Sequence, residues 1–369
     1  MKEKKSLIGM FIFIICVFVI LIGGALIYNK FFFSKTYTET EELMREAAIS
    51  YFKANNSKLP KVINNSTTIK VDTLVKQGYM KDLGKYLKGA KSCSGEVIVT
   101  NINGDYRYAP YLDCGKKYQT ISFIDYIKDN VKIVVNDNGL NNLNDTLVYR
   151  GDNVDNYLKI GGKIYRIVKF VDGKAVIILT DNSTETIWDN RYNVITSSNT
   201  GINDYEVSRI KDYLNALYEE TGENRLLGKR SRMLVVSHNL PIGKRCNADN
   251  DKSGKLENAQ VLENQYIGLL TVSDYLNASL DENCTGVLED NASKPCSNYN
   301  YLNRYKYNWW TVTANSKNTF RAYVVNKDED IVKSTNASDK AYVRPVLYIS
   351  SDAIYVSGNG TKDKPFVIK

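Results

Sequence analysis

Histidine is almost absent from this chain of 369 residues: His238 is the only one. A single imidazole cannot supply the several histidine ligands that many catalytic zinc sites use, and any Ser-His-Asp triad would have to include this residue. His238 follows an apolar, strand-like run at residues 233–236, which favours a structural role. No two cysteines have the C-x2-C spacing of a zinc site. We therefore predict no metal ligands and no cofactor.

Excess positive charge is also scarce outside the N-terminal segment. The net charge is +8, but residues 1–35 contain five lysines and one glutamate, so the other 334 residues carry only +4. A nucleic-acid-binding protein would show a basic patch or stripe, so we predict no nucleic-acid partner. Paired-carboxylate motifs and glycine-rich phosphate loops are not visible either, and we expect a protein that is not an enzyme.

A single long apolar run dominates the N-terminal region. Residues 7–28, from Leu7 to Tyr28, contain no charged side chain, and a helix of 22 residues would rise about 33 Å, enough to cross a bilayer core of about 30 Å. Three lysines precede the run, and lysines on a short flank favour the cytoplasmic side. We predict a cytoplasmic tail at residues 1–6, a single-pass transmembrane signal anchor at 7–28 and an extracellular bulk.

Two alternatives compete with an uncleaved anchor. Gly23 and Ala25 are small enough for a signal-peptidase site, but the apolar character continues to residue 33, and the run is longer than the h-region of a signal peptide. A prepilin would carry a glutamate after a glycine cleavage site within the run, and no acidic residue interrupts it.

The first external segment has helix signals followed by a hairpin signal. Thr38 and Glu41 form a capping box ahead of an apolar stripe that includes Met44 and Phe52. A second short helix should begin with Asp72 as its N-cap and end at Gly78. Strands are expected at residues 96–101 and 106–112, on either side of Asn103-Gly104.

The hairpin register predicts a disulfide. With Asn103 and Gly104 as the turn, opposed residues have numbers that sum to 207, and Cys93 and Cys114 satisfy this sum. They fall at a site that is not hydrogen-bonded, where opposed side chains are closest. Outside the cell such a pair oxidises.

Residues 37–120 resemble the membrane-proximal, pilin-like ectodomain of exported proteins from low-GC Gram-positive bacteria. The resemblance lies in the helix after the span, in the segment from Val75 to Met80, and in the cysteine-bounded hairpin, 93–97 with 111–114. It implies a scaffold or assembly role, and a plain stalk is the alternative. We predict a stalk domain over residues 36–125.

A polar, Asn- and Asp-rich linker is expected at residues 126–147, followed by an irregular α+β domain at 148–369 with more strand than helix. A hairpin is predicted about Asp172-Gly173, between strands 157–170 and 174–180, and a helix should begin at Asn203, capped by Glu206, with Val207 and Leu217 on its buried face. Further strands are expected at residues 266–271, 308–313, 321–325, 342–349, 353–356 and 366–368, with a helix starting at Ser273.

This second domain resembles bacterial surface domains related to the C-type-lectin-like fold of formylglycine-generating enzymes. The matching segments are 164–167, 208–215, 267–275, Trp309-Trp310 and 343–346, with a closing signature at 358–361 and 365–368. The resemblance implies a membrane-anchored surface protein with a non-catalytic binding, adhesion or assembly role, whose ligand is an extracellular glycan or protein. An exported enzyme on the same scaffold is the alternative, although no reactive cysteine pair can be placed here.

The remaining candidate residues are cysteines, acids and tryptophans. Cys284 and Cys296 enclose a short polar loop typical of a structural disulfide, which leaves Cys246 as a free thiol, while Cys16 lies in the span. Asp249, Asp251 and Glu257 match an EF-hand loop only in part, because Gln260 stands where a bidentate glutamate is required. Trp309 and Trp310 are candidate ligand-facing aromatics; adjacent strand residues point to opposite faces, so at least one should be in the core.

Overall fold

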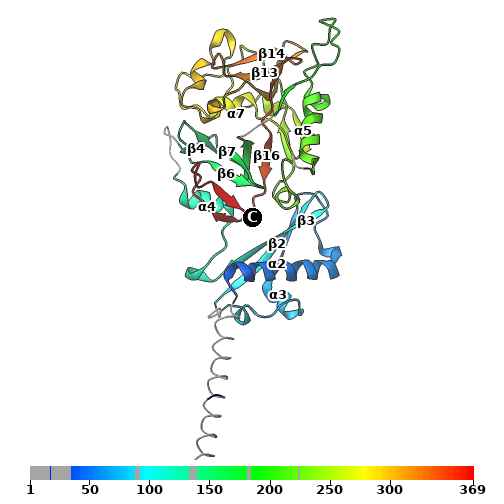
Figure 1. Cartoon of the computed structure of the whole chain (residues 1–369), viewed down its shortest axis with the longest axis vertical. Helices are drawn as coiled ribbons and strands as arrows, with labels where there is room; N and C mark the ends of the chain where they lie inside the picture. The colour runs from blue at the N-terminus through cyan, green and yellow to red at the C-terminus, as the bar shows by residue number, and fades with distance from the viewer. Residues whose placement is uncertain (1–16, 18–34, 88–91, 133–138, 181–183, 223–224) are drawn as a thin grey trace, which may run out of the picture. The chain divides into compact units, whose positions relative to one another are not determined.

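The structure, a computed structural model, describes residues 17, 35–87, 92–132, 139–180, 184–222 and 225–369 (Figure 1). It contains two compact units: the first comprises Met1–Pro60, Ser66–Thr100 and Tyr108–Thr120, and the second comprises Lys61–Asn65, Asn101–Arg107 and Ile121–Lys369. Within these described ranges, no helix is long and apolar enough to cross a membrane. The predicted anchor at residues 7–28 lies outside them except for Val17.

Unit 1 combines two α-helices with a three-stranded sheet of order β1-β2-β3 in its described part. Its elements are α2 (Tyr37–Ala54), η1 (Asn56–Lys58), β1 (Ser66–Lys70), α3 (Val71–Lys76), η2 (Leu83–Lys85), β2 (Ser94–Ile102), β3 (Asp105–Asp113) and η3 (Gly115–Lys117). The long helix α2 buries the predicted apolar stripe, including Met44, Ala48 and Phe52. Fold class α+β is therefore correct for this unit.

The predicted helix caps were wrong by two residues. Thr36, not Thr38, caps α2: its hydroxyl accepts the Glu39 N–H at 3.1 Å, and the Glu39 carboxylate accepts the Thr36 N–H at 2.7 Å. The sequence repeats T-x-x-E in two overlapping frames, and Glu41 is buried instead, accepting a hydrogen bond from the Tyr118 hydroxyl at 2.8 Å. Likewise α3 has Lys70 as its N-cap, although Gly78 takes the expected left-handed conformation after the helix.

The hairpin between β2 and β3 matches the prediction. Asn103 and Gly104 both have positive φ, 53° and 89°, the pattern of a type I′ turn. The Cys93–Cys114 disulfide is present, with a Cα–Cα distance of 4.1 Å, so the register sum of 207 led to the pair that the structure contains.

Unit 2 is built mainly from sheets, with short helices around them (Figure 1). In its described residues an eight-stranded sheet runs β16-β8-β7-β6-β18-β17, with β5 paired to β7 and β4 paired to β5; a five-stranded sheet runs β14-β13-β12-β15-β9; and β10 pairs with β11. The helices are α4 (Phe123–Asn130), α5 (Arg209–Glu219), α6 (Lys229–Arg232) and α7 (Val272–Asn277). The strands are β4 (Gly139–Leu143), β5 (Thr146–Arg150), β6 (Tyr157–Ile160), β7 (Lys163–Val171), β8 (Lys174–Leu179), β9 (Glu185–Ile187), β10 (His238–Pro241), β11 (Val261–Gln265), β12 (Trp309–Ala314), β13 (Arg321–Asn326), β14 (Ile331–Asn336), β15 (Lys340–Tyr342), β16 (Val346–Ile349), β17 (Tyr355–Ser357) and β18 (Phe366–Ile368).

The segment predicted as a linker, residues 126–147, instead belongs to this unit. Ile127 of α4 and Leu140 of β4 have no exposed surface and join its hydrophobic core. The Asn- and Asp-rich composition of the segment marks the turn between β4 and β5, where Asn144 and Asp145 adopt positive φ.

Other predicted elements needed correction. The strand expected at 157–170 is two strands, β6 and β7, because Gly161 and Gly162 make a turn with φ of 58° and 84°. The helix expected from Asn203 begins after Ser208, and Val207 is 53% exposed.

Two further corrections concern the end of the domain. Residues 266–271 are not a strand; they lead to Thr271, which caps α7 two residues before the predicted start. The strand expected at 342–349 is interrupted at Pro345, which separates β15 from β16.

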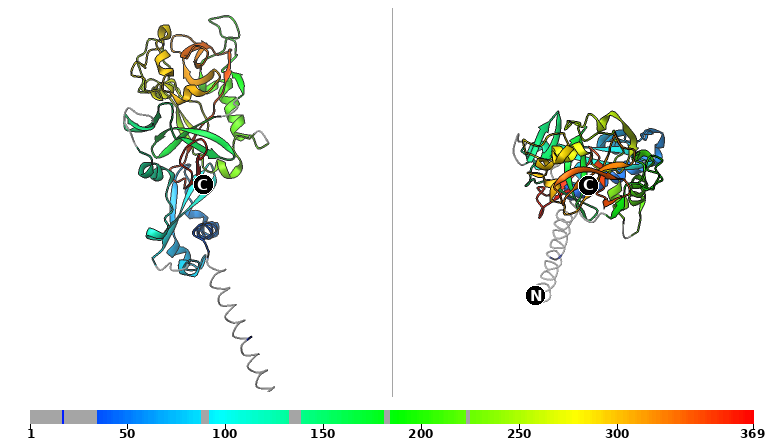
Figure 2. Two further views of the ribbon diagram at one scale, coloured as in Figure 1. Left: turned by 60° about the vertical axis from the view of Figure 1, so that its left-hand side comes forward. Right: turned by 90° about the horizontal axis from the view of Figure 1, so that it is seen from above.

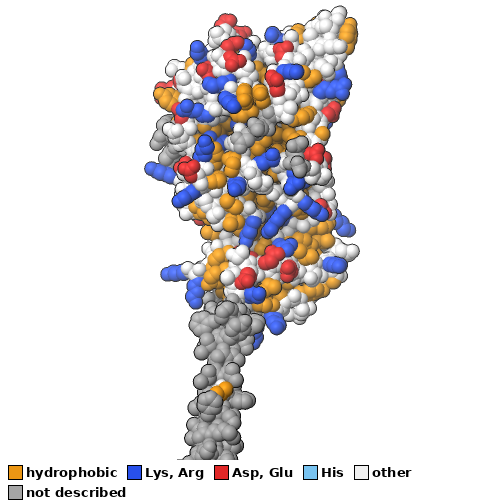
Figure 3. All heavy atoms as spheres, in the orientation of Figure 1, with side chains coloured by type: hydrophobic (Ala, Val, Ile, Leu, Met, Phe, Trp, Pro, Cys, Tyr) orange, Lys and Arg blue, Asp and Glu red, His pale blue; other side chains and the backbone are white. Residues whose placement is uncertain are grey.

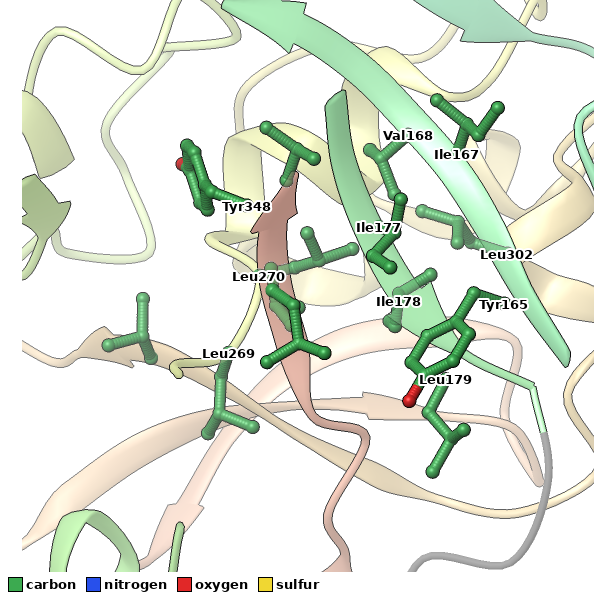
Figure 4. Packing of buried hydrophobic residues seen from close by; sticks show 14 of the residues in the cluster. Tyr165, Ile167, Val168, Ile177, Ile178, Leu179, Leu269, Leu270, Leu302 and Tyr348 are labelled. Atoms are coloured by element: carbon green, nitrogen blue, oxygen red, sulfur yellow. The ribbon is translucent and has the colours of Figure 1, made fainter. Parts of the chain in front are cut away.

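The core of unit 2 lies on the central strands of the larger sheet. Side chains from β7, β8 and β16 meet those of the segment before α7 (Figure 4). The labelled core residues are Tyr165, Ile167, Val168, Ile177, Ile178, Leu179, Leu269, Leu270, Leu302 and Tyr348. These strands read as continuous apolar runs because both of their faces are covered.

Candidate ligand-binding site

A polar cavity of about 760 Å³ opens in unit 2, next to the segment that follows the second disulfide. Four separate segments of the chain contribute to it. Its lining residues are Asp152, Asp281, Ser297, Asn298, Tyr299, Asn300, Asn303, Arg304, Lys306, Lys327 and Asp330. Carboxylates, amides, hydroxyls and cations thus converge on one hollow, which is the composition of a site that orients a polar ligand.

Much of the cavity wall comes from residues 297–306, which directly follow the second disulfide. Cys284 and Cys296 are bonded, as predicted, with a Cα–Cα distance of 4.5 Å. The buried Asn300 side chain donates to the carbonyls of Tyr275 at 2.9 Å and Cys296 at 2.8 Å, and its own oxygen accepts the Leu302 N–H at 3.0 Å. A buried amide with all of these bonds made fixes the backbone on either side of it.

The charged lining residues pair across the cavity wall. Asp152 lies 3.2 Å from Arg304, and Asp330 bonds to Lys327. Hydrogen bonds from Lys327 and then Asn303 lower the pKa of Asp330 below its ordinary value. The lining contains three aspartates against one arginine and two lysines, so at neutral pH the wall has no net formal charge.

Asp281 is held in the same way. Its carboxylate accepts a 2.7 Å hydrogen bond from the Asn298 side chain and a 2.8 Å bond from the Asn283 N–H. These two bonds lower the pKa of Asp281. The carboxylate is therefore ionised and already oriented before a ligand arrives.

Tyr299 is the unusual residue of the cavity. Its side chain is 59% exposed and its φ is 45°, a left-handed conformation that is costly for a residue with a bulky side chain. Its carbonyl accepts the Leu280 N–H at 3.2 Å. Strain of this kind concentrates at binding sites, where the surrounding structure sustains it, and here it places an aromatic ring in solvent.

The two tryptophans proposed as ligand-facing residues are both in the core. Trp309 and Trp310 are 1% and 0% exposed. The Trp310 indole N–H donates to the Thr186 carbonyl at 2.9 Å, and the Arg344 guanidinium lies 5.0 Å from the Trp309 ring. Their strand, β12, has neighbours on both sides and every one of its residues is buried, so neither face is available to a ligand.

Cys246 is the free thiol among the described cysteines, as predicted. Its sulfur donates a hydrogen bond to Asp249 at 3.1 Å, and the same carboxylate accepts the Cys246 N–H at 2.6 Å. Cys246 does not line the cavity.

His238 is a buried structural residue. Its ring stacks on Tyr348 with a centroid distance of 3.5 Å, and neither ring nitrogen has a hydrogen-bond partner. Burial, and then the nearby charges of Lys174 and Lys169, lower the pKa of His238 to about 3. The imidazole is therefore neutral at physiological pH.

The acidic loop that resembles part of an EF-hand is internally bonded. Asp251 accepts the N–H groups of Ser253 at 2.8 Å and Leu256 at 2.9 Å, and Glu257 pairs with Arg245 at 3.4 Å. Among the residues that the structure describes, no cluster of His, Cys, Asp or Glu could hold a metal ion.

Sequence reasoning missed this cavity because its residues are dispersed from position 152 to position 330. The signal that could have indicated it is the polar run at residues 297–300, directly after Cys296. Comparison of the chain with protein-family models, with curated proteins and with solved structures gave no significant match.

Proposed function

We propose that this protein is a membrane-anchored bacterial surface protein with a non-catalytic binding role, and that the cavity of unit 2 binds a carbohydrate. The apolar run at residues 7–28, with lysines before it, supports an anchor with a cytoplasmic N-terminus. We infer a carbohydrate ligand from one observation: the cavity combines a polar wall without net charge with the exposed ring of Tyr299.

A carbohydrate fits this combination for two reasons. Its hydroxyl groups both donate and accept, so they match a wall in which carboxylates and amides stand beside ammonium and guanidinium groups. Its C–H faces are apolar and can lie against an aromatic ring such as Tyr299. A wall without net charge favours a neutral sugar over a phosphorylated or strongly acidic one.

A binding role is favoured over the enzyme alternative by the position of the reactive groups. The enzyme hypothesis calls for titratable groups converging near Cys246 or His238. His238 is buried and neutral, and neither residue is part of the cavity wall.

The test is a glycan-array screen of the full chain, followed by calorimetric titration of the best neutral glycan. Tyr299→Ala should weaken binding about tenfold, because stacking on an aromatic ring contributes about 1 kcal/mol or more. Tyr299→Phe should retain most of the affinity, since the ring face is preserved.

Tyr192→Ala is the matched control, because Tyr192 is another exposed tyrosine, 55% accessible, that does not line the cavity. Equal losses for Tyr192→Ala and Tyr299→Ala would place the ligand elsewhere. Binding that is unchanged by Tyr299→Ala and by Asp281→Asn would refute the cavity as the site.

A further inference from the structure

A projecting loop of unit 2 carries an apolar tip. We call residues 191–201 the finger; it extends beyond the sheets in Figure 1 and in the left view of Figure 2. Three of its large apolar side chains are exposed: Val194 by 80%, Ile195 by 68% and Tyr192 by 55%. No other stretch of the described chain gathers three exposed large apolar side chains within four residues, and Figure 3 shows orange and white spheres at this tip.

The finger is built to hold this tip in place. Asn193 is buried; its N–H donates to the Ser198 carbonyl at 2.8 Å, and its side chain donates to the Gly201 carbonyl at 3.0 Å. The Asn193 amide oxygen accepts the Ile195 N–H at 3.0 Å. The pairing of Asn193 with Ser198 makes a short hairpin in which Val194 and Ile195 lie at the apex.

The base of the finger is fixed just as firmly. Asp189 has no exposed surface and accepts the N–H groups of Arg191 and Ile202, each at 2.9 Å. Gly201 has φ of 90°, and a Cβ there would lie 2.4 Å from the Asp189 carbonyl oxygen, so only glycine fits. A loop this well braced presents its apolar tip permanently.

The finger has one charged residue, Arg191 at its base, and it pairs with Asp189 at 2.9 Å. Residues 192–203, twelve in number, include no Asp, Glu, Lys or Arg. The hydroxyls near the apex bond one another: Thr196 and Thr200 are 2.6 Å apart, and Ser198 donates to Thr196 at 3.1 Å. Internal pairing of this kind lowers the cost of moving polar groups into a less polar medium.

The size of the tip distinguishes between partners. The projecting finger has only eleven residues, 191–201, whereas a stable protein interface takes about 20–30 residues from each partner. A small apolar contact with lipid is weak alone but useful as a second attachment for an anchored chain, so this inference rests on the anchor proposed at residues 7–28. We propose that the finger inserts Val194 and Ile195 into a lipid surface, with Tyr192 at headgroup level.

This inference is independent of the cavity and makes a distinctive prediction. Residues 36–369 carry a net charge of +4, which can draw the chain to anionic vesicles through charge alone. Insertion of the finger's uncharged tip should need no anionic lipid and should persist at high salt, where charge-driven adsorption is screened.

The experiment uses the full chain with Cys16→Ser and Cys246→Ser, reconstituted in phosphatidylcholine nanodiscs at high salt. An environment-sensitive fluorophore is attached at Ile195→Cys or, as a control, at Val207→Cys, whose native side chain is 53% exposed and lies outside the finger. Spin-labelled phosphatidylcholine is placed either in the nanodisc or in added protein-free vesicles, so that the chain's own bilayer and a facing one are both sampled.

We expect lipid quenching of the probe at 195 in at least one arm and none at 207. Val194→Asp should reduce the inserted fraction about tenfold or more, since a charge near the acyl region costs more than the free energy of a tenfold step. Equal access of aqueous iodide to both probes in both arms would overturn the proposal. So would quenching that requires anionic lipid and low salt, or shielding from iodide without lipid quenching, which would indicate a protein contact.

Discussion

The most demanding prediction concerns the ion pair between Arg245 and Glu257, whose side chains are 0% and 1% exposed. The guanidinium lies 3.4 Å from the carboxylate and donates to the carbonyls of Asp249 at 3.0 Å and Asp251 at 2.9 Å. The carboxylate accepts the Ser273 hydroxyl at 3.0 Å. The pair therefore joins the acidic loop to the start of α7.

Arg245→Met should destabilise unit 2 by about 3–5 kcal/mol, because it leaves a buried carboxylate without a counter-charge. It also removes the donor from three backbone carbonyls, those of Asp249, Asp251 and Gly286. Replacing both partners, Arg245→Met with Glu257→Leu, should cost clearly less than the sum of the single changes, since no unpaired charge remains. Lys333→Met is the control: it breaks an exposed pair with Glu329 and should cost about 1 kcal/mol or less.

Tryptophan fluorescence during denaturant unfolding is the suitable assay. All three tryptophans, Trp188, Trp309 and Trp310, belong to unit 2 and are buried, so their emission reports this unit alone. If Arg245→Met lowered the free energy of unfolding by less than about 1 kcal/mol, as breaking an exposed ion pair does, the buried pair would not have the stabilising role argued here.

The pH dependence supplies a second readout. Burial raises the pKa of Glu257, and the attraction of Arg245 offsets this only in part. A carboxyl group with a raised folded-state pKa contributes stability that is complete below its unfolded pKa of about 4.3 and is lost as pH rises through the folded value. Between pH 4 and pH 7 the parent chain should therefore lose stability relative to Glu257→Gln. A parent chain that gains stability relative to the variant would contradict the sign.

Three further predictions follow from the cysteines, from His238 and from the apolar run. Replacing Cys93 and Cys114 by alanine should destabilise unit 1 by about 2–4 kcal/mol without shifting the unfolding transition that tryptophan fluorescence reports for unit 2. Circular dichroism melting measures the loss in unit 1. An equal shift in both signals would refute the assignment of this disulfide to unit 1. The pKa of His238 is lowered to about 3, so its contribution to stability is complete above about pH 6.5 and is lost as pH falls toward 3. In His238→Phe the free energy of unfolding should fall less steeply with decreasing pH. An unchanged pH dependence would exclude His238 as the source of the acid destabilisation. External protease applied to wall-stripped cells should remove nearly all of the chain, because the lysines before residues 7–28 favour a cytoplasmic N-terminus; immunoblotting that recovers the full-length chain would contradict this topology.

Local turn chemistry made parts of this fold predictable. Asn103-Gly104 and Asp172-Gly173 each sit at the turn of a hairpin, and in both pairs φ is positive at both residues. A two-residue turn fixes the register of the strands that follow it, which is why the disulfide could be located by counting. Capping was less predictable, because Thr36 and Thr38 each precede a glutamate by three residues and only tertiary burial of Glu41 distinguishes the two frames.

Long-range packing determined the rest. The span from residue 126 to residue 147 is polar enough to read as a linker, yet Leu140 is buried because β4 pairs with β5 and extends the large sheet. Strand pairing between distant segments, such as β18 with β6 and β12 with β15, leaves no periodicity in the sequence. Residue type could not reveal these contacts.

The aromatic residues show why the site in particular could not be predicted. Tryptophan is a common ligand platform, so Trp309 and Trp310 stood out, but a strand with neighbours on both sides buries whatever it carries. Tyr299 and Tyr192 were two among 27 tyrosines. Their exposure depends on the backbone: Tyr299 has positive φ three residues after the disulfide-bonded Cys296, and Tyr192 lies in a finger braced by Asn193 and Gly201. Which aromatic side chain meets solvent is thus decided by backbone geometry, and both proposed contacts of unit 2, the carbohydrate and the lipid, depend on that geometry.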